Sequence, residues 1–116
     1  MLIHVRTDNH IEAPEELVAG VTTAIEDSLG RFQPQLTRVE VYLADENSHK
    51  TGDNDKRCTI EARLSGLQPL AATGSGAILD QALDGALDKL ASLLEHKLGR
   101  LGERKGRTSF SGEPAD

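Results

Sequence analysis

Three stretches of the chain alternate between apolar and polar residues, which is the pattern of a strand that buries one face. They are LIHVR at residues 2–6, TRVEVYLADE at 37–46 and KRCTIEARLS at 56–65. A shorter strand, PLAAT at 69–73, is expected after the turn sequence SGLQ, because proline is tolerated at the start of a strand or on an edge. The residues expected to face the core are Ile3, Val5, Val39, Val41, Leu43, Cys58, Ile60, Ala62 and Leu64.

Two other segments carry apolar residues at helical spacing. The first begins at Pro14, which suits a first helical turn, and is expected to stop at Gly30 in a left-handed conformation. The second is expected to run from about Gly76 to Leu101, after GSG ends the fourth strand and Ser75 caps the helix. Their apolar stripes are Leu17, Val18, Val21, Ala24, Ile25 and Leu29 in the first helix, and Leu79, Ala82, Leu83, Ala86, Leu90, Leu93, Leu94 and Leu101 in the second.

The element order β-α-β-β-β-α predicts an α+β fold, a four-stranded mixed sheet in the order 1-2-3-4 with two helices packed on one face. The first two strands are joined through a helix and should be parallel, whereas strands two to four follow one another as an antiparallel meander. Because each strand has a single apolar face, both helices are expected to cover that face and to leave the other in water.

The composition is that of one globular domain, with 116 residues of which 37% are hydrophobic and 28% charged. A net charge of -6 excludes a protein that coats nucleic acid through its overall field, so nucleic-acid binding would require a local basic patch. The single Cys58 cannot form an internal disulfide, which favours a reducing, cytoplasmic setting. No apolar run approaches the roughly 18 residues of a membrane helix, and the N-terminus lacks a secretion signal.

No catalytic or cofactor-binding constellation is found. TGSGAIL at residues 73–79 places glycines before a helix, as phosphate-binding loops do, but it lacks a third glycine and a Walker lysine, so a turn with a cap is favoured. Cys58 alternates with core residues, and Asp53 and Asp55 belong to a polar loop at residues 47–55 that is expected to be mobile. The histidines lie in different elements without metal-ligand spacing: His4, His10, His49 and His96. We therefore expect no enzyme activity, metal or cofactor.

The second helix is charge-segregated, because at 100° per residue its acids fall on one flank and its bases on the other. The acidic flank is Asp80, Asp84, Asp88 and Glu95, and the basic flank is Lys89, His96 and Arg100. One interpretation is complementarity with the helix dipole, since the acids lean towards the N-terminus and the bases towards the C-terminus. The other is a phosphate-contacting strip formed by Lys89, Arg100, Arg104, Lys105 and Arg107.

The polar side of the sheet is a second candidate surface, formed by His4, Arg6, Arg38, Glu40, Tyr42, Arg57, Thr59, Glu61 and Arg63. Arginines outnumber acids there, and Tyr42 offers one ring on which a base can stack. The alternative, which we favour over direct base contact, is Arg-to-Glu pairing between strands on a solvated surface. With 3% aromatic residues, the face cannot be a stacking platform of the RNP type. Its candidate RNA contacts are Arg6, Arg38, Arg57 and Arg63.

Two segments resemble the ribosome hibernation-promoting factors, the S30AE-type proteins also called ribosome-associated protein Y. LDGALDKLASLL at residues 83–94 is similar to the second-helix signature of that family, and IEAPEEL followed by GRFQPQLTRVEVYL resembles its passage from first to second strand. The resemblance implies a cytoplasmic, non-enzymatic factor that binds the small ribosomal subunit, with its 16S-type rRNA and proteins, and no membrane. It further implies occupancy of the tRNA and mRNA channel, which inhibits or stores ribosomes under stress. Residues 1–102 would be the ribosome-binding domain and 103–116 a basic, then flexible, tail.

Only some of the positions that are basic in the family are basic in this sequence. Lys89 matches the lysine of the D-K-L motif, and Arg100 falls on a basic position near the end of the second helix. Family members commonly have lysine or arginine at positions that here are Val18, Ala24, Asp27, Ser92 and His96. The alternative is therefore a divergent member without RNA binding, which acts as a protein-interaction module through the acidic face of its first helix or associates weakly with itself through a sheet edge.

Overall fold

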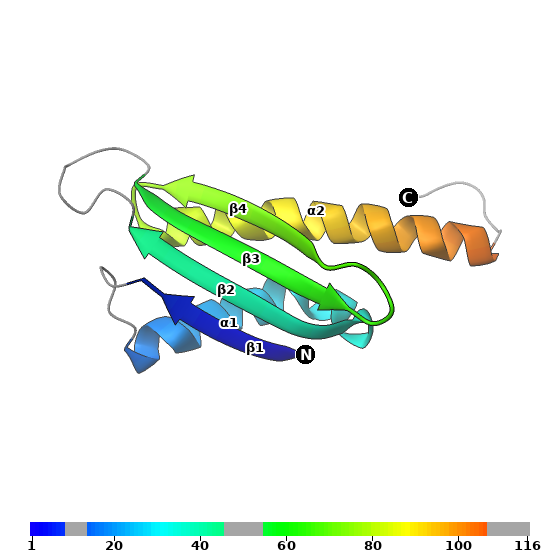
Figure 1. Cartoon of the computed structure of the whole chain (residues 1–116), viewed down its shortest axis with the longest axis horizontal. Coiled ribbons are helices and arrows are strands. Elements are labelled where there is room, and N and C mark those ends of the chain that lie inside the picture. The colour runs from blue at the N-terminus through cyan, green and yellow to red at the C-terminus, as the bar shows by residue number, and fades with distance from the viewer. Residues whose placement is uncertain (9–13, 46–54, 107–116) are drawn as a thin grey trace.

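The computed structural model describes residues 1–8, 14–45 and 55–106, and it describes side chains up to Gly99 (Figure 1). The loop predicted at residues 47–55 lies outside this description except for Asp55, and the tail from residue 107 lies outside it entirely.

In the described part of the chain, the elements follow one another in the predicted order β-α-β-β-β-α, so the α+β class is confirmed. The strands are β1 (Leu2–Thr7), β2 (Leu36–Asp45), β3 (Lys56–Leu64) and β4 (Leu70–Gly76). The helices are α1 (Glu15–Leu29) and α2 (Leu79–Gly106), with a 3₁₀ segment η1 (Gly30–Gln35) between α1 and β2.

The sheet has the predicted order β1-β2-β3-β4. β1 pairs with β2 in parallel, and β2, β3 and β4 pair antiparallel. The turn between β3 and β4 contains Gly66 at φ 75°, a left-handed conformation that glycine adopts without steric cost. The parallel pair follows from the crossover through α1, and the antiparallel pairs from direct connections.

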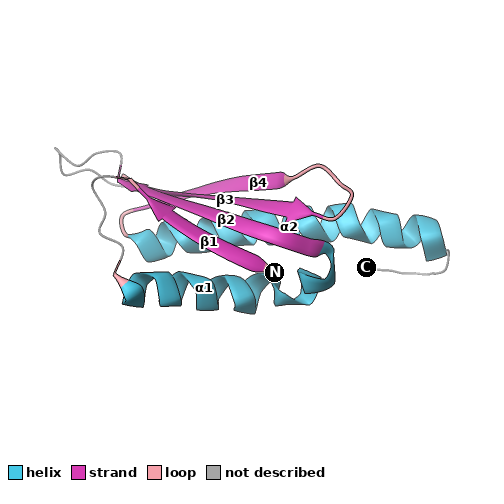
Figure 2. Cartoon of the chain, turned by 60° about the horizontal axis from the view of Figure 1, so that its bottom comes forward, coloured by secondary structure: helices cyan, strands magenta, loops and turns pink. Residues whose placement is uncertain are grey.

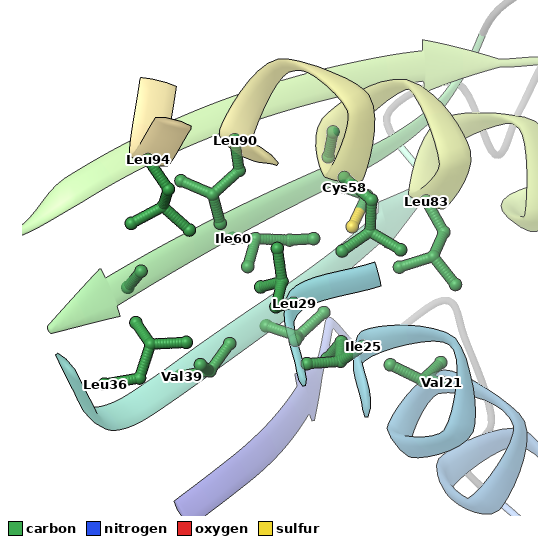
Figure 3. Close-up of a cluster of buried hydrophobic side chains, with 14 of the residues drawn as sticks. Val21, Ile25, Leu29, Leu36, Val39, Cys58, Ile60, Leu83, Leu90 and Leu94 are labelled. Atoms are coloured by element: carbon green, nitrogen blue, oxygen red, sulfur yellow. The ribbon is translucent and has the colours of Figure 1, made fainter. Parts of the chain in front are cut away.

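Both helices pack against the same face of the sheet, and the opposite face is open (Figure 2). The buried side chains of the two helices meet those of β2 and β3 in one cluster (Figure 3). Ile25 of α1, Ile60 of β3 and Leu90 of α2 are completely buried. Each such side chain stabilises the fold by roughly 1.5–3 kcal/mol. None of the described helices is long and apolar enough to span a membrane.

The end of α1 differs from the prediction. Gly30 has φ -59° and ψ -31°, a right-handed conformation, so it does not stop the helix in the left-handed region. The chain instead tightens into η1, which buries Phe32 and brings Pro34 into a 3₁₀ turn. A 3₁₀ turn of this kind is a common way to satisfy the last carbonyls of an α-helix, and it removes the need for a left-handed residue.

The junction between β4 and α2 also differs. The GSG sequence does not end the strand, because Ser75 and Gly76 pair with Arg57 and Lys56 of β3. Ser75 is therefore a strand residue and not a helix cap, and α2 begins at Leu79 and runs to Gly106. The backbone N–H of Ala77 is satisfied by Oε1 of Gln81 at 2.9 Å, in the manner of the Gln in a capping box.

The predicted buried stripe of α2 is wrong at two positions. Leu87 is buried, with 3% of its surface exposed, although the predicted stripe omitted it, and Leu93 is 42% exposed although it was included. The helix packs against both the sheet and α1, so the side that faces α1 is buried as well. Leu93 lies on the side of β4, an edge strand that leaves it partly uncovered. The side chain of Leu101 lies outside the described residues.

Candidate nucleic-acid interface

The nine predicted site residues fall in three places. Arg6, Arg38, Arg57 and Arg63 lie on the strands of the open sheet face, and Lys89 lies on α2 beside β4. Arg100, Arg104 and Lys105 belong to the helical backbone of α2, but their side chains are outside the description, as is the whole of Arg107. The structure thus brings together the four arginines, and it separates them from Lys89 by the edge of β4.

Charges on the open face are arranged in rows of like sign across the strands. Arg38 is the register partner of Arg63, and in the next row Glu40 is the partner of Glu61. Like charges directly opposite each other on two strands are unfavourable. The two rows compensate for this, since each arginine lies two residues from a glutamate on its own strand.

Arg6, Arg38 and Arg63 each lie close to a glutamate. Nε of Arg38 is 2.8 Å from Oε2 of Glu40 without the alignment of a hydrogen bond, and a guanidinium nitrogen of Arg63 is 3.3 Å from Oε1 of Glu61. Arg6 reaches Glu40 from the neighbouring strand at 3.8 Å. The Arg-to-Glu pairing that the sequence suggested is therefore present, and of these three described pairs only Arg6–Glu40 joins two strands.

These ion pairs leave the arginines available to other anions. The side chains of Arg6, Arg38 and Arg63 are 61%, 42% and 51% exposed. Solvent-exposed pairs of this kind contribute about 0–1 kcal/mol, so a phosphate can displace or share the carboxylate. Arg57, opposite Ser75 near the β4 edge, is also exposed.

Tyr42 stands in the middle of this face and is 42% exposed. Its register partners are Arg6 on β1 and Thr59 on β3. A hollow of about 240 Å³ lies beside it, bounded by Glu40, Glu61 and the small side chain of Ala71, among others. Sequence reasoning identified the ring but missed the hollow, which forms because β4 places an alanine where the other strands carry long side chains.

Lys89 links α2 to the edge of the sheet. Its Nζ donates a hydrogen bond of 2.9 Å to the carbonyl oxygen of Thr73 in β4. The hydroxyl of Thr73 lies on the open face, 3.1 Å from the hydroxyl of Thr59. The lysine thus places a positive charge at the border of the open face, and it covers one carbonyl of an edge strand.

Of the acidic flank of α2, Asp88 borders Lys89 in a hollow against β4, whereas Glu95 lies on the side of η1. Glu95 forms an exposed ion pair of 2.8 Å with Arg31 of η1, on the side of α1. Helix α1 contributes further acids and no base, in Glu15, Glu16, Glu26 and Asp27. The charge segregation predicted for the helix is therefore oriented in the fold, with Lys89 next to β4 and Glu95 next to η1.

The glycines of TGSGAIL have a packing role. A Cβ atom at Gly74 would collide with the backbone of Ala82 and Ala86, so only glycine allows α2 to lie this close to β4. Gly85, the glycine of the D-G-x-x-D-K-L motif, faces Gly74 across this contact. Strand pairing and helix packing account for these glycines without a phosphate ligand.

The remaining titratable groups form no metal site within the described residues. Lys56 lies 3.2 Å from Asp55 and 3.4 Å from Asp45, and the hydrogen bond to Asp55 is the main reason why its pKa is raised. Cys58 is fully buried between β3 and the helices, and desolvation raises the pKa of its thiol to about 12. A thiol with this pKa stays protonated near neutral pH, as expected of a core residue.

The sequence matches the family described as Sigma 54 modulation protein / S30EA ribosomal protein over residues 3–102. The chain belongs to this family, a family of ribosome-associated proteins. The resemblance drawn from the second-helix motif is thereby confirmed. No curated protein sequence matches the chain.

Two solved structures share the fold. The N-terminal domain of Thermus thermophilus Protein Y is similar with a TM-score of 0.66 and 21% identity, over 84% of this chain and 99% of that one. A ribosomal subunit interface protein from Coxiella burnetii is similar with a TM-score of 0.65 and 14% identity, over 85% of this chain and 99% of that one. At these identities the likeness shows the fold and not the binding residues.

Proposed function

We propose that this protein binds the small ribosomal subunit and, by occupying the channel of tRNA and mRNA, inhibits or stores ribosomes under stress. The observation that carries the proposal is the family match over residues 3–102. The structural neighbours, one of which is described as a ribosomal subunit interface protein, support it. The protein would act in the cytoplasm by occupancy and not by catalysis, with residues 1–102 as its ribosome-binding unit.

The charge arrangement supports binding to rRNA despite the net charge of -6. Lys89 lies at the β4 edge next to the open face, and Arg57 of β3 lies opposite Ser75 of β4. Arg100 follows Lys89 by eleven positions, about three helical turns, along a backbone that remains helical to Gly106. Positive charge can thus contact phosphates from the sheet edge along α2.

A co-sedimentation experiment with purified small subunits tests the proposal. The protein should sediment with the subunits, and its affinity should fall steeply with salt, because each neutralised phosphate adds nearly one unit to the slope of log affinity against log salt. The double variant Lys89→Glu/Arg100→Glu should bind more weakly and with a flatter slope. The control Asp80→Lys/Asp84→Lys, on the opposite flank, should bind as well as the wild type or better.

The alternative is a member that does not bind RNA and acts as a protein-interaction or weakly self-associating module. The pairing of Arg6, Arg38 and Arg63 with glutamates favours it, as does the acidic face of α1. This alternative expects either no association with small subunits or an association that salt and the Lys89→Glu/Arg100→Glu variant leave unchanged.

A further inference from the structure

The charged side chains that the structure describes are divided between two sides of the protein. The open sheet face, defined by His4, Arg6, Arg38, Glu40, Tyr42, Arg57, Thr59, Glu61, Arg63, Ala71, Thr73 and Ser75, carries four arginines and two glutamates. All other described side chains together carry four cationic and eleven acidic groups. The Debye length at physiological salt is about 8 Å, so each side presents mainly its own charges to an approaching polyanion. RNA is therefore attracted to the open sheet face and to the β4 edge where Lys89 lies, and it is repelled by the acidic residues of α1.

We infer that the open sheet face is the RNA-contacting surface of this protein, and that the hollow beside Tyr42 receives one unpaired base whose flanking phosphates lie on the arginines. This inference rests on the proposed function and specifies its binding surface.

Tyr42 supplies the stacking surface. It is 42% exposed at the centre of the face, and the adjoining hollow of about 240 Å³ leaves room beside the ring. Unpaired bases stack on aromatic side chains that stand on an open sheet. Because Tyr42 is the only ring among the described residues that line the hollow, the hollow accommodates one base and not a run of bases.

The side chains that line the hollow determine which base it binds best. Glu40 and Glu61 both line it and are register partners. Carboxylates only accept hydrogen bonds, and two of them in opposing positions favour a donor placed between them. The exocyclic amino groups of cytosine, adenine and guanine carry two N–H bonds and can donate to both carboxylates, whereas uracil has only its single N3–H donor. The hollow therefore favours an amino-bearing base over uracil.

The arginines surround this position. Arg6 borders the hollow from β1, and Arg63 lies two residues along β3 from Glu61. Arg57 lies on the other side of Thr59 on the same strand. An RNA strand that crosses the face thus meets a guanidinium on either side of the stacked base, and guanidinium groups bind phosphate oxygens in a bidentate manner.

The full-length protein offers a direct probe of stacking, because Tyr42 is its only tyrosine and it has no tryptophan. Intrinsic fluorescence therefore reports on this ring alone. Addition of oligo(C) or oligo(A) RNA of about ten nucleotides should quench the emission, and oligo(U) should do so only at several-fold higher concentration. The Glu61→Gln variant should bind oligo(U) and oligo(C) with more similar affinities, since an amide can donate as well as accept.

Binding to purified small subunits tests the surface itself. Tyr42→Ala should weaken binding roughly five- to 100-fold, the range expected for the loss of one stacked base, while Tyr42→Phe should restore most of it. Arg57→Gln/Arg63→Gln should weaken binding and reduce its salt dependence. The matched control is Arg31→Gln, which removes an exposed arginine that is likewise paired with a glutamate, but on the helix side. It should bind as the wild type does.

The outcomes separate the inference from the proposed function. If the wild type binds subunits and the Tyr42 and Arg57/Arg63 variants bind equally well, the open sheet face is not the RNA surface, although the proposed function stands. If the wild type does not bind subunits, the proposed function is wrong. The fluorescence experiment with oligonucleotides then tests whether the base site beside Tyr42 exists. Quenching of Tyr42 with preference for oligo(C) over oligo(U) would then support the base site, and no quenching by any oligonucleotide would overturn it.

Discussion

Gly74 of β4 and Gly85 of α2 face each other, so closely that a Cβ atom on Gly85 would lie 3.6 Å from Cα of Gly74. The approach places Lys89, one turn further along α2, within reach of the carbonyl of Thr73. Packing of the helix on the edge strand therefore sets the position of a candidate RNA contact.

Replacement of Gly74 by alanine should strongly destabilise the fold. The added methyl group would collide with the backbone of α2, which cannot yield as a flexible side chain can, so we expect a loss of about 2–4 kcal/mol in the free energy of unfolding. Urea denaturation measures this loss. The control is Gly20→Ala, at an exposed position of α1 with open space around it, which should stabilise by about 1 kcal/mol. Equal effects of the two variants would contradict the close contact.

Truncation of Leu87 should destabilise the protein much more than truncation of Leu93. Leu87→Ala removes a side chain that is 3% exposed and should cost about 2–5 kcal/mol of unfolding free energy. Leu93→Ala affects a side chain that is 42% exposed and should cost less than about 1 kcal/mol. The same denaturation assay compares the two, and a larger loss for Leu93 would show that α2 is rotated relative to the structure.

Cys58 should react slowly with a thiol reagent in the native protein. It is fully buried, and its raised pKa keeps it in the unreactive thiol form. Labelling with a chromogenic disulfide at pH 7–8 should be slow in buffer and fast and stoichiometric in denaturant. Fast labelling of the native protein would place the thiol outside the core.

The same thiol should make stability depend on alkaline pH. In the unfolded chain Cys58 ionises near pH 9, whereas in the folded protein its pKa is about 12, so between these values the folded state binds more protons. Stability must then fall as pH rises above about 9, by about 1.4 kcal/mol per pH unit for this group, and it is fully present below that pH.

A comparison with Cys58→Ala isolates this contribution. The variant lacks the thiol and retains every other ionisable side chain of the protein. The difference in unfolding free energy between wild type and variant should shrink from pH 8.5 to 10.5. A difference that stays constant would show that the thiol ionises equally in both states.

The amino-acid sequence by itself determined the strands, their order and their facing. Alternation places Val39, Val41 and Ile60 on one side of their strands whatever the neighbours are, because successive side chains of a strand point to opposite faces. The family followed from the motif around Gly85 and Lys89. Alternation along a strand follows from the geometry of the extended backbone, so it can be recognised from residues that are neighbours in the sequence.

Only the tertiary structure decided where elements end and which residues meet. Ser75 resembles a cap in sequence but pairs with Arg57, and Leu87 is buried because α1 packs beside α2. The hollow beside Tyr42 requires Ala71, which lies 29 residues further along the chain and is brought close by two strand pairings. Register and helix packing join residues that are distant in sequence, and no local pattern contains that information.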